Sequence, residues 1–239
     1  MSDIHGNIVA FEQVLKSLAE HGVDRYLCLG DIVGYGARPN ECCDLVRELD
    51  HVAVSGNHDL AASQPGLERW FTSAARASIL WTRETLTSDN LDFLQSLAVT
   101  TSAGDARLCH ASLTDTSTYV AWPEQAMESF GLMDGRLCFF GHTHYAEWFV
   151  QNQAGKLPEQ LTAASGAVVR LEKGYRYMIN PGAVGQPRDG DSRAAFAVYD
   201  DMASTVEIFR VEYDIASTQK QIVAAGLPSG MATRLSNGR

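Results

Sequence analysis

The hydrophobic and polar positions of the first sixty residues alternate between helical and strand-like patterns. Apolar residues recur at helical spacing from 11 to 18, after Asn7, a residue typical of N-caps, and Gly22 follows as a stop. Residues 23–29 and 51–55 are predicted strands, and a helix over about 42–49 separates them. This alternation predicts an α/β fold, in which functional groups gather beyond the carboxyl ends of the strands.

The middle of the chain changes from helical to strand-like character. Residues 67–97 are predicted to form a helical pair, with Ser88 capping the second helix. Two strands, 99–102 and 106–109, follow with a Gly-Asp turn between them. A helix from Pro123 to about residue 130 then precedes a short apolar strand over 137–140.

The last third is rich in β-type segments that Gly, Asp and Asn separate. Residues 147–151, 167–172, 175–179, 194–199 and 205–213 predict a mostly antiparallel sheet. Asp214 is the expected cap of a final helix over 215–225. We expect a single domain over residues 1–226 and a loose C-terminal tail over 227–239, whose Gly, Pro, Ser and Asn content is typical of mobile ends.

Composition narrows the class of protein. The 239 residues suffice for one well-filled domain, and the net charge of −10 argues against binding of extended DNA or RNA. The five cysteines lie mostly in apolar runs, without a Cys-x-x-Cys pair, so we expect buried, reduced thiols. No apolar stretch approaches the roughly 20 residues that span a bilayer. We therefore expect a cytoplasmic protein without a membrane segment; its oligomeric state is left open.

Candidate metal ligands follow several of the apolar runs. They are Asp3, His5, Asp31, Asn57, His58, His110, His142 and His144. If the strand before Gly141 continues, His142 and His144 point to the same side. Imidazole, carboxylate and amide groups together suit Mn, Fe, Zn or Co. Eight groups exceed the needs of one ion, so the set favours two divalent metal ions about 3.5–4 Å apart, with Asp31 as the natural bridge.

The motifs Asp3-x-His5, Gly30-Asp31, Gly56-Asn57-His58-Asp59, His110 and Gly141-His142-x-His144 together resemble those of the calcineurin-like metallophosphoesterase superfamily. The resemblance implies an α/β sandwich, in which two mixed β-sheets pack face to face and helices flank them. It also implies ligand sets. Asp3, His5 and His144 hold one metal, Asn57, His110 and His142 hold the other, and Asp31 bridges them.

The resemblance further implies hydrolysis of a phosphomonoester or phosphodiester bond in a small substrate, with a nucleotide as one candidate. A hydroxide activated by two metal ions attacks phosphorus, and His58 protonates the leaving oxygen as general acid. Residues 180–188 resemble a loop found in bacterial and archaeal members, so Arg188 either binds a phosphate or is an ordinary surface residue. The alternative function is a non-catalytic protein-binding scaffold on the same fold, which can dispense with the acid histidine that this chain retains.

Two departures from the family pattern change the expectations. Gly34-Tyr35 stands where the serine/threonine phosphatase branch has Asp-Arg, which argues against protein phosphatase activity. Only two residues precede Asp3, so the first core strand is apparently truncated. We expect an apolar strand upstream, without which Asp3 and His5 lose their support.

Other residues have ordinary structural interpretations. His21 and His51 are expected at the surface, next to helix ends. Asp59 is expected to cap a short helix in preference to orienting His58. Trp70, Phe71, Leu80 and Trp81 either line a substrate site or, as we expect, belong to the core.

Overall fold

The computed structural model describes residues 1–152 and 154–239, and its largest sheet has six strands. In spatial order these are β3 (Thr100–Ala103), β4 (Ala106–Cys109), β5 (Leu137–Phe139), β9 (Tyr175–Pro181), β6 (Ala146–Asn152) and β7 (Glu159–Thr162). The central strands β4, β5 and β9 run parallel, and the outer pairs are antiparallel. The sheet is therefore mixed, and it includes β7, which the sequence did not predict.

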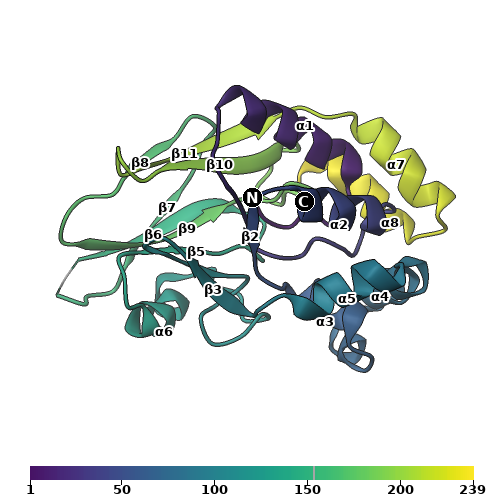
Figure 1. Cartoon of the computed structure of the whole chain (residues 1–239), viewed down its shortest axis with the longest axis horizontal. Coiled ribbons are helices and arrows are strands. Elements are labelled where there is room, and N and C mark those ends of the chain that lie inside the picture. Colours follow the sequence, from purple (N-terminus) through teal and green to yellow (C-terminus); the bar gives the residue numbers. More distant parts are fainter. Residues whose placement is uncertain (153) are drawn as a thin grey trace.

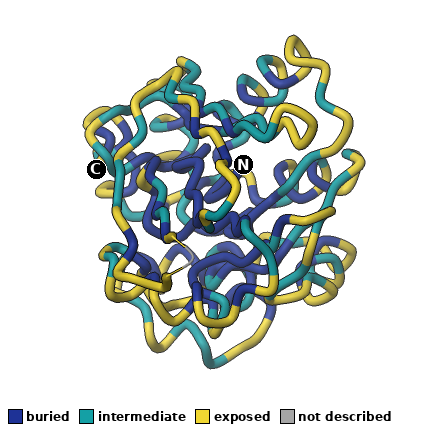
Figure 2. Tube along the Cα trace, turned by 90° about the vertical axis from the view of Figure 1, so that its left-hand side faces the viewer, coloured by how far each residue is buried: buried dark blue, intermediate teal, exposed yellow. Residues whose placement is uncertain are grey.

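A second layer contains the remaining strands, of which β8, β10 and β11 lie above this sheet in Figure 1. It consists of an antiparallel sheet, β10 (Ala194–Asp200), β11 (Thr205–Val211) and β8 (Val168–Arg170), and a parallel pair, β1 (Tyr26–Cys28) and β2 (His51–Ala53). The two layers enclose one apolar cluster that includes Leu108, Ile179, Val206 and Ile208. Figure 2 shows the buried chain at the centre of the molecule. The face-to-face packing of two β-layers is thereby confirmed.

Residues 1–3 and 183–185 join the two parts of the second layer. The Leu29 amide donates to the Met1 carbonyl at 3.0 Å, and the Val184 amide donates to the Ser2 carbonyl at 2.9 Å. These residues therefore occupy the central position of the layer although they are not assigned as a strand.

The expectation that Asp3 and His5 lack support is wrong for this structure. Their amides donate to the carbonyls of Gly30 and Asp31, at 3.0 and 2.8 Å.

A cavity of about 1080 Å³ lies beside Met1, between β1 and β10. Burial lowers the pKa of the Met1 amine at the edge of this cavity.

Helices surround the two layers (Figure 1). They are α1 (Ile8–Glu20), α2 (Pro39–Glu48), α3 (Asn57–Ser63), α4 (Ser73–Thr85), α5 (Ser88–Ser96), α6 (Pro123–Leu132), α7 (Ile215–Ala224) and α8 (Ser229–Thr233), with 3₁₀ turns at Leu67–Trp70 (η1) and Arg234–Asn237 (η2). Asn7 and Asp214 cap α1 and α7 as predicted, whereas the cap of α5 is Thr87 instead of Ser88. In the described residues, no helix is long and apolar enough to cross a membrane.

Residues 227–239 are not the loose tail that their composition predicts. They form α8 and η2, and they bury Met231 and Leu235 in a cluster with α7. The Gly190 amide also donates to the Gly238 carbonyl at 3.0 Å. Burial of apolar side chains stabilises this segment and outweighs the local preference of its Gly and Ser residues for irregular structure.

Candidate metal centre

Loops that follow the strands carry every predicted ligand to one place at the edge of the layers. Asp31 follows β1, Asn57 and His58 begin α3 after β2, His110 follows β4, and His142 and His144 follow β5. Asp3, His5, Asp31, Tyr35, His142 and His144 all have φ between 51° and 66°. Residues other than glycine seldom adopt this left-handed region, and such strain clusters at functional sites. The two histidines after β5 therefore reach the site from a strained loop and not from a continuing strand.

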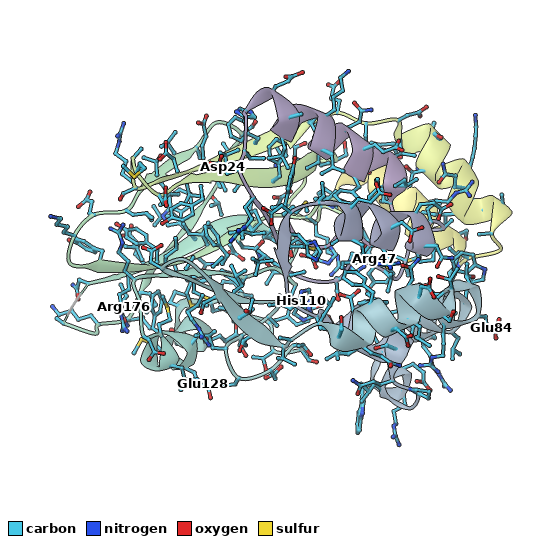
Figure 3. The ribbon with its side chains drawn as sticks, viewed as in Figure 1. Asp24, Arg47, Glu84, His110, Glu128 and Arg176 are labelled. Carbon is cyan, nitrogen blue, oxygen red and sulfur yellow. The ribbon has the colours of Figure 1, made fainter. Side chains whose placement is uncertain are left out.

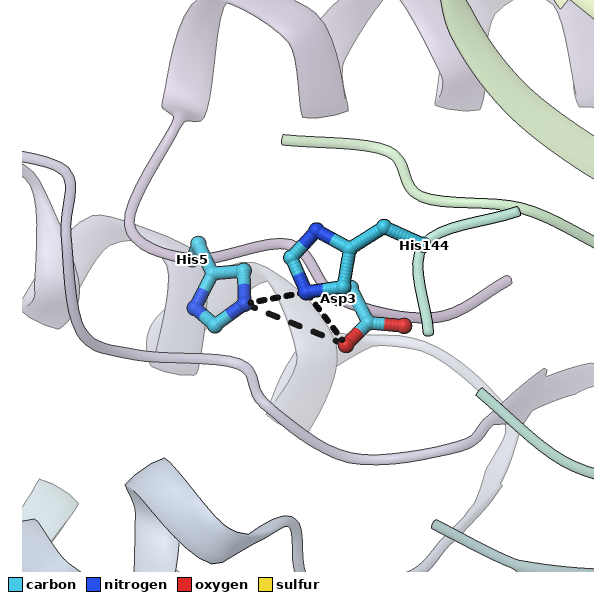
Figure 4. A group of neighbouring side chains, drawn as sticks. All are labelled: Asp3, His5 and His144. Carbon is cyan, nitrogen blue, oxygen red and sulfur yellow. Dashed lines mark hydrogen bonds and ion pairs between the residues drawn. The ribbon is translucent and has the colours of Figure 1, made fainter. Parts of the chain in front are cut away.

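Asp3, His5 and His144 form the first ligand group (Figure 4). The Nε2 atoms of the two histidines lie 3.2 Å apart, and Asp3 Oδ1 lies 3.2 Å from His144 Nε2. His5 Nδ1 lies 3.1 Å from the Val33 carbonyl oxygen, and His144 Nδ1 lies 2.5 Å from the Gln186 carbonyl oxygen. Because a carbonyl only accepts, both Nδ1 atoms carry the proton and both neutral rings present a bare Nε2.

Three acceptor atoms thus converge without a donor between them. Asp3 Oδ1 is buried and has no hydrogen-bond partner. A buried carboxylate oxygen facing two imidazole lone pairs is unfavourable unless a cation lies among them. The donor chemistry of this group therefore fits a metal ion.

Asp31, His110 and His142 form the second ligand group. His110, which lies near the centre of the molecule in Figure 3, donates from Nδ1 to the Leu29 carbonyl at 2.8 Å. His142 donates from Nε2 to the Ser117 carbonyl at 3.0 Å, so its Nδ1 is the free nitrogen. Main-chain carbonyls therefore fix the tautomers here as they do in the first group.

Asn57 and Asp31 complete the arrangement. Asn57 Oδ1 lies 3.1 Å from His110 Nε2, which adds an amide oxygen to the second group. Asp31 Oδ2 lies 3.5 Å from His5 Nε2 and 3.3 Å from His110 Nε2. This oxygen stands between the two groups, within 3.5 Å of a histidine nitrogen of each.

Burial and mutual charge shift the pKa values of the site. Burial lowers the pKa of His142 to about 3 and that of His5 well below its usual range. Burial opposes ionisation of Asp31, but the charges of His110 and His58 hold its pKa well below the usual range. For His110 the Asp31 carboxylate overcomes burial and raises the pKa to about 9. The neutral rings of His5 and His142 and the ionised carboxylate of Asp31 are the forms that bind metals, whereas His110 would have to release a proton to bind one.

His58 lies beside both groups and forms a third set of possible metal ligands with His5 and Asp31. Its amide donates to Asp31 Oδ1 at 2.8 Å, and its Nδ1 is buried without a partner. Burial lowers its pKa to about 4, and Asp31 offsets part of that effect. The rings of Tyr35 and Phe71 lie 4.4 and 4.9 Å from it, centroid to centroid.

Trp70, Phe71, Leu80 and Trp81, which lie between α3 and α5 in the chain, differ in what they contact. Phe71 contacts His58, whereas Trp70 is 81% exposed and Leu80 is 36% exposed, so the core prediction is wrong for these three. Trp81 packs against the C-terminal apolar cluster, as a core residue does.

Asp59 holds two ligand loops together without contacting the His58 ring. Its oxygens accept hydrogen bonds from the Gly56 amide at 3.0 Å and the Val33 amide at 3.1 Å. The first of these contacts closes the first turn of α3, where Gly56 and not Asp59 is the N-cap, and the second reaches the loop after β1. Asp59 therefore joins the segments that carry Asp31 and Asn57.

The loop over 180–188 returns to the site. Asn180 donates to the Gly141 carbonyl at 2.8 Å and to Thr143 Oγ1 at 2.9 Å, and so fixes the loop between His142 and His144. The Arg188 guanidinium lies 5.7 Å from the Tyr35 ring centroid. The resemblance of residues 180–188 to a family loop implied this return, but no sequence signal revealed the contacts that Tyr35 and Asn180 make here.

Gly185 packs directly against the N-terminal ligand loop. Its amide donates to the Asp3 carbonyl at 2.8 Å. A Cβ atom at Gly185 would lie 1.9 Å from the Ile4 carbonyl oxygen, a distance at which backbone must move. Only glycine therefore fits at this approach.

His21 and His51 lie outside both ligand groups. His21 is exposed and His51 is half-buried.

Comparisons with known proteins agree with this geometry. The sequence model of the calcineurin-like phosphoesterase superfamily domain matches residues 1–202. Protein MJ0912 of Methanocaldococcus jannaschii is 36% identical over 244 residues, covering 100% of this chain and 97% of its own length. Phosphodiesterase YfcE of Escherichia coli is 34% identical over 73 residues, which are 26% of this chain and 40% of YfcE.

A solved structure extends the similarity to three dimensions. The crystal structure of a metallophosphoesterase from Sphaerobacter thermophilus superposes with a TM-score of 0.89 at 41% identity, covering 100% of this chain and 97% of that one. The whole architecture, including the C-terminal helices, is therefore shared with a metallophosphoesterase.

Proposed function

This chain belongs to the calcineurin-like phosphoesterase superfamily, and on that premise we propose that it hydrolyses a phosphomonoester or phosphodiester bond of a small substrate at a site for two metal ions. Nucleotides are candidate substrates. The observation that carries the proposal is the convergence of Asp3 Oδ1, which has no hydrogen-bond partner, with the Nε2 atoms of His5 and His144, because a cation would stabilise such a group of acceptors.

The donor atoms fit two first-row divalent or transition ions such as Mn, Fe, Zn or Co. Asp3, His5 and His144 would hold one ion, Asn57, His110 and His142 would hold the other, and Asp31 would serve both. When bound, two such ions lower the pKa of a water molecule and neutralise charge on phosphate oxygens. The backbone carbonyls behind the histidines keep each free nitrogen aimed inward before any ion arrives.

His58 is proposed to protonate the leaving oxygen. With a pKa near 4, its ring is neutral at pH 7 in the free protein. A phosphate anion beside the ring would raise that pKa, because an opposite charge favours the protonated form. His58 would then hold its proton only while substrate is bound, which suits a general acid.

Arg188 is proposed to bind a phosphate oxygen. Its Nε and one terminal nitrogen share the Gln186 Oε1 acceptor, at 3.3 and 2.9 Å. No ion pair with a carboxylate involves it in the described part of the chain. A planar guanidinium with spare donors is suited to bidentate contact with phosphate.

The test is hydrolysis of bis(p-nitrophenyl) phosphate by protein loaded with Mn²⁺. Asp31→Asn should remove activity, and His58→Ala should lower it by about 10²–10⁴-fold. His51→Ala is the matched control, since this histidine lies outside both ligand groups. Turnover by the unchanged protein no greater than that of Asp31→Asn would refute the proposal.

A further inference from the structure

Glu147 is a buried acidic residue that the proposed hydrolysis does not use. It is the second residue of β6 and is 4% exposed, and none of the ion pairs among the described residues includes it. Burial raises its pKa, and hydrogen bonds from Gln160 and Thr143 oppose that effect. Burial of a carboxylate without a cationic partner is unfavourable unless hydrogen bonds satisfy its oxygens. The partners of the two oxygens therefore indicate what this residue does.

The first carboxylate oxygen holds the hydroxyl group of Thr143, the residue between the two histidines that follow β5. Thr143 Oγ1 lies 3.1 Å from Glu147 Oε1. The same hydroxyl accepts from the Asn180 side-chain amide at 2.9 Å and from the Tyr145 main-chain amide at 3.3 Å. Because both amides only donate, the hydroxyl proton is left for Glu147. The carboxylate thereby fixes the side chain at the centre of the ligand loop.

The second carboxylate oxygen is connected to the segment behind His142. Gln160 Nε2, from β7, donates to Glu147 Oε2 at 2.7 Å and to the Ala121 carbonyl at 2.9 Å. Ala121 belongs to the segment between β4 and α6, in which the Ser117 carbonyl accepts from His142 Nε2 at 3.0 Å. Glu147 is therefore linked to both segments that orient the His142 ring, namely its own loop and the segment behind it.

The six-stranded sheet gives this carboxylate a rigid base. The strands β6 and β9 lie side by side in Figure 1, and Glu147 is directly opposite Asn180 in their antiparallel register. Asn180 also donates to the Gly141 carbonyl at 2.8 Å. One strand thus presents an acceptor and its neighbour a donor to the same ligand loop, and groups held on strands are more precisely placed than groups on loops.

We propose that Glu147 is a positioning residue for the metal centre, which acts through Thr143 and Gln160 to hold the two histidines after β5 in the orientation that binds metal. The inference rests on the proposed function, because it requires the site for two ions. Residues that orient metal ligands typically contribute about 10–100-fold to metal affinity. His142 and His144 belong to different ligand groups, so loss of the carboxylate should weaken the binding of both ions.

Titration with Mn²⁺, in which electron paramagnetic resonance measures the free ion, tests this role without requiring turnover. Glu147→Leu removes both acceptor oxygens and should weaken Mn²⁺ binding by about 10–100-fold. Glu147→Gln retains one oxygen for the Thr143 hydroxyl and should bind Mn²⁺ more tightly than Glu147→Leu. Gln151→Leu is the matched control. Gln151 is 2% exposed, lies on the same face of β6 and donates to the Lys156 carbonyl at 2.9 Å, so its loss should destabilise the fold without changing the Mn²⁺ affinity.

The outcomes separate this role from the proposed function. Equal Mn²⁺ affinity in Glu147→Leu and Gln151→Leu overturns the role of Glu147, because a residue that only stabilises the fold would affect metal binding no more than its control. If Glu147→Leu does not fold, Thr143→Val decides the question, since it removes the hydroxyl that Thr143→Ser retains. Mn²⁺ affinity as high in the valine variant as in the serine variant then overturns the proposal. A parent protein that binds no Mn²⁺ overturns both proposals, whereas the expected affinities without hydrolysis of any ester refute the proposed function alone.

Discussion

Gly185→Ala should displace the N-terminal ligand loop and release a metal ion. The new Cβ would begin 1.9 Å from the Ile4 oxygen, and real Cβ contacts are at least 3.0 Å, so the backbone must move by about 1 Å. Metal sites tolerate changes of only about 0.2 Å in ligand distances. Asp3 and His5 flank Ile4 in the chain, so they would move with it. The backbone shift is therefore several times larger than the change in ligand distance that a metal site tolerates.

The same substitution should also destabilise the fold. Overpacking costs about 1–3 kcal/mol, and each kcal/mol lowers the melting temperature of a chain this long by about 2–4 °C. We expect a decrease of about 2–12 °C by calorimetry, with metal content reduced by about half in plasma mass spectrometry. Gly131→Ala, within α6 and with no atom near its Cβ, is the matched control and should match or exceed the parent melting temperature. A Gly185→Ala protein that retains full metal content would refute the reasoning.

Three further predictions concern the metals and the N-terminus. His142→Ala should lose metal in mass spectrometry, whereas His58→Ala should retain it and lose turnover mainly for esters with high-pKa leaving groups; equal metal loss would contradict the role of His58. Chelation should lower the melting temperature by about 5–10 °C for metal originally at about 100 times its Kd, and an unchanged value would argue against bound metal. An added stretch of about five apolar residues before Met1 should enter the cavity between β1 and β10 and raise the melting temperature, and an unchanged melting temperature would count against this placement.

The sequence predicted most of the local structure because its signals are local. The Asn7 and Asp214 side chains accept hydrogen bonds from Ala10 and Ser217, three residues away, so the capping residue itself indicates the helix start. At α5 two adjacent hydroxyl residues compete for the same role, and Thr87 takes it. The C-terminal helices depend on burial of residues such as Met231, which no local pattern reveals.

The candidate site likewise contains some residues that sequence motifs predicted and others that they did not. The residues of the two candidate ligand groups were predicted from motifs, because the chemistry of a metal centre restricts the residue types at each position. Tyr35 belongs to a residue type common on many surfaces, and only the folded chain brings its ring against His5 and His58. The strand β7 escaped prediction because Glu159–Thr162 lacks a buried alternation and is held mainly by its pairing with β6.

The tethering of the first seven residues has a consequence for synthesis on the ribosome. Asn7 donates to the Gly185 carbonyl and accepts from the Thr218 hydroxyl, 178 and 211 residues further along the chain. At about 5–20 residues per second, the ribosome needs roughly 10–40 s to deliver the second partner. During that interval the nascent chain holds Asp3 and His5 without their later neighbours. The loop that carries Asp3 and His5 therefore gains its last tether only after residue 218 has been translated.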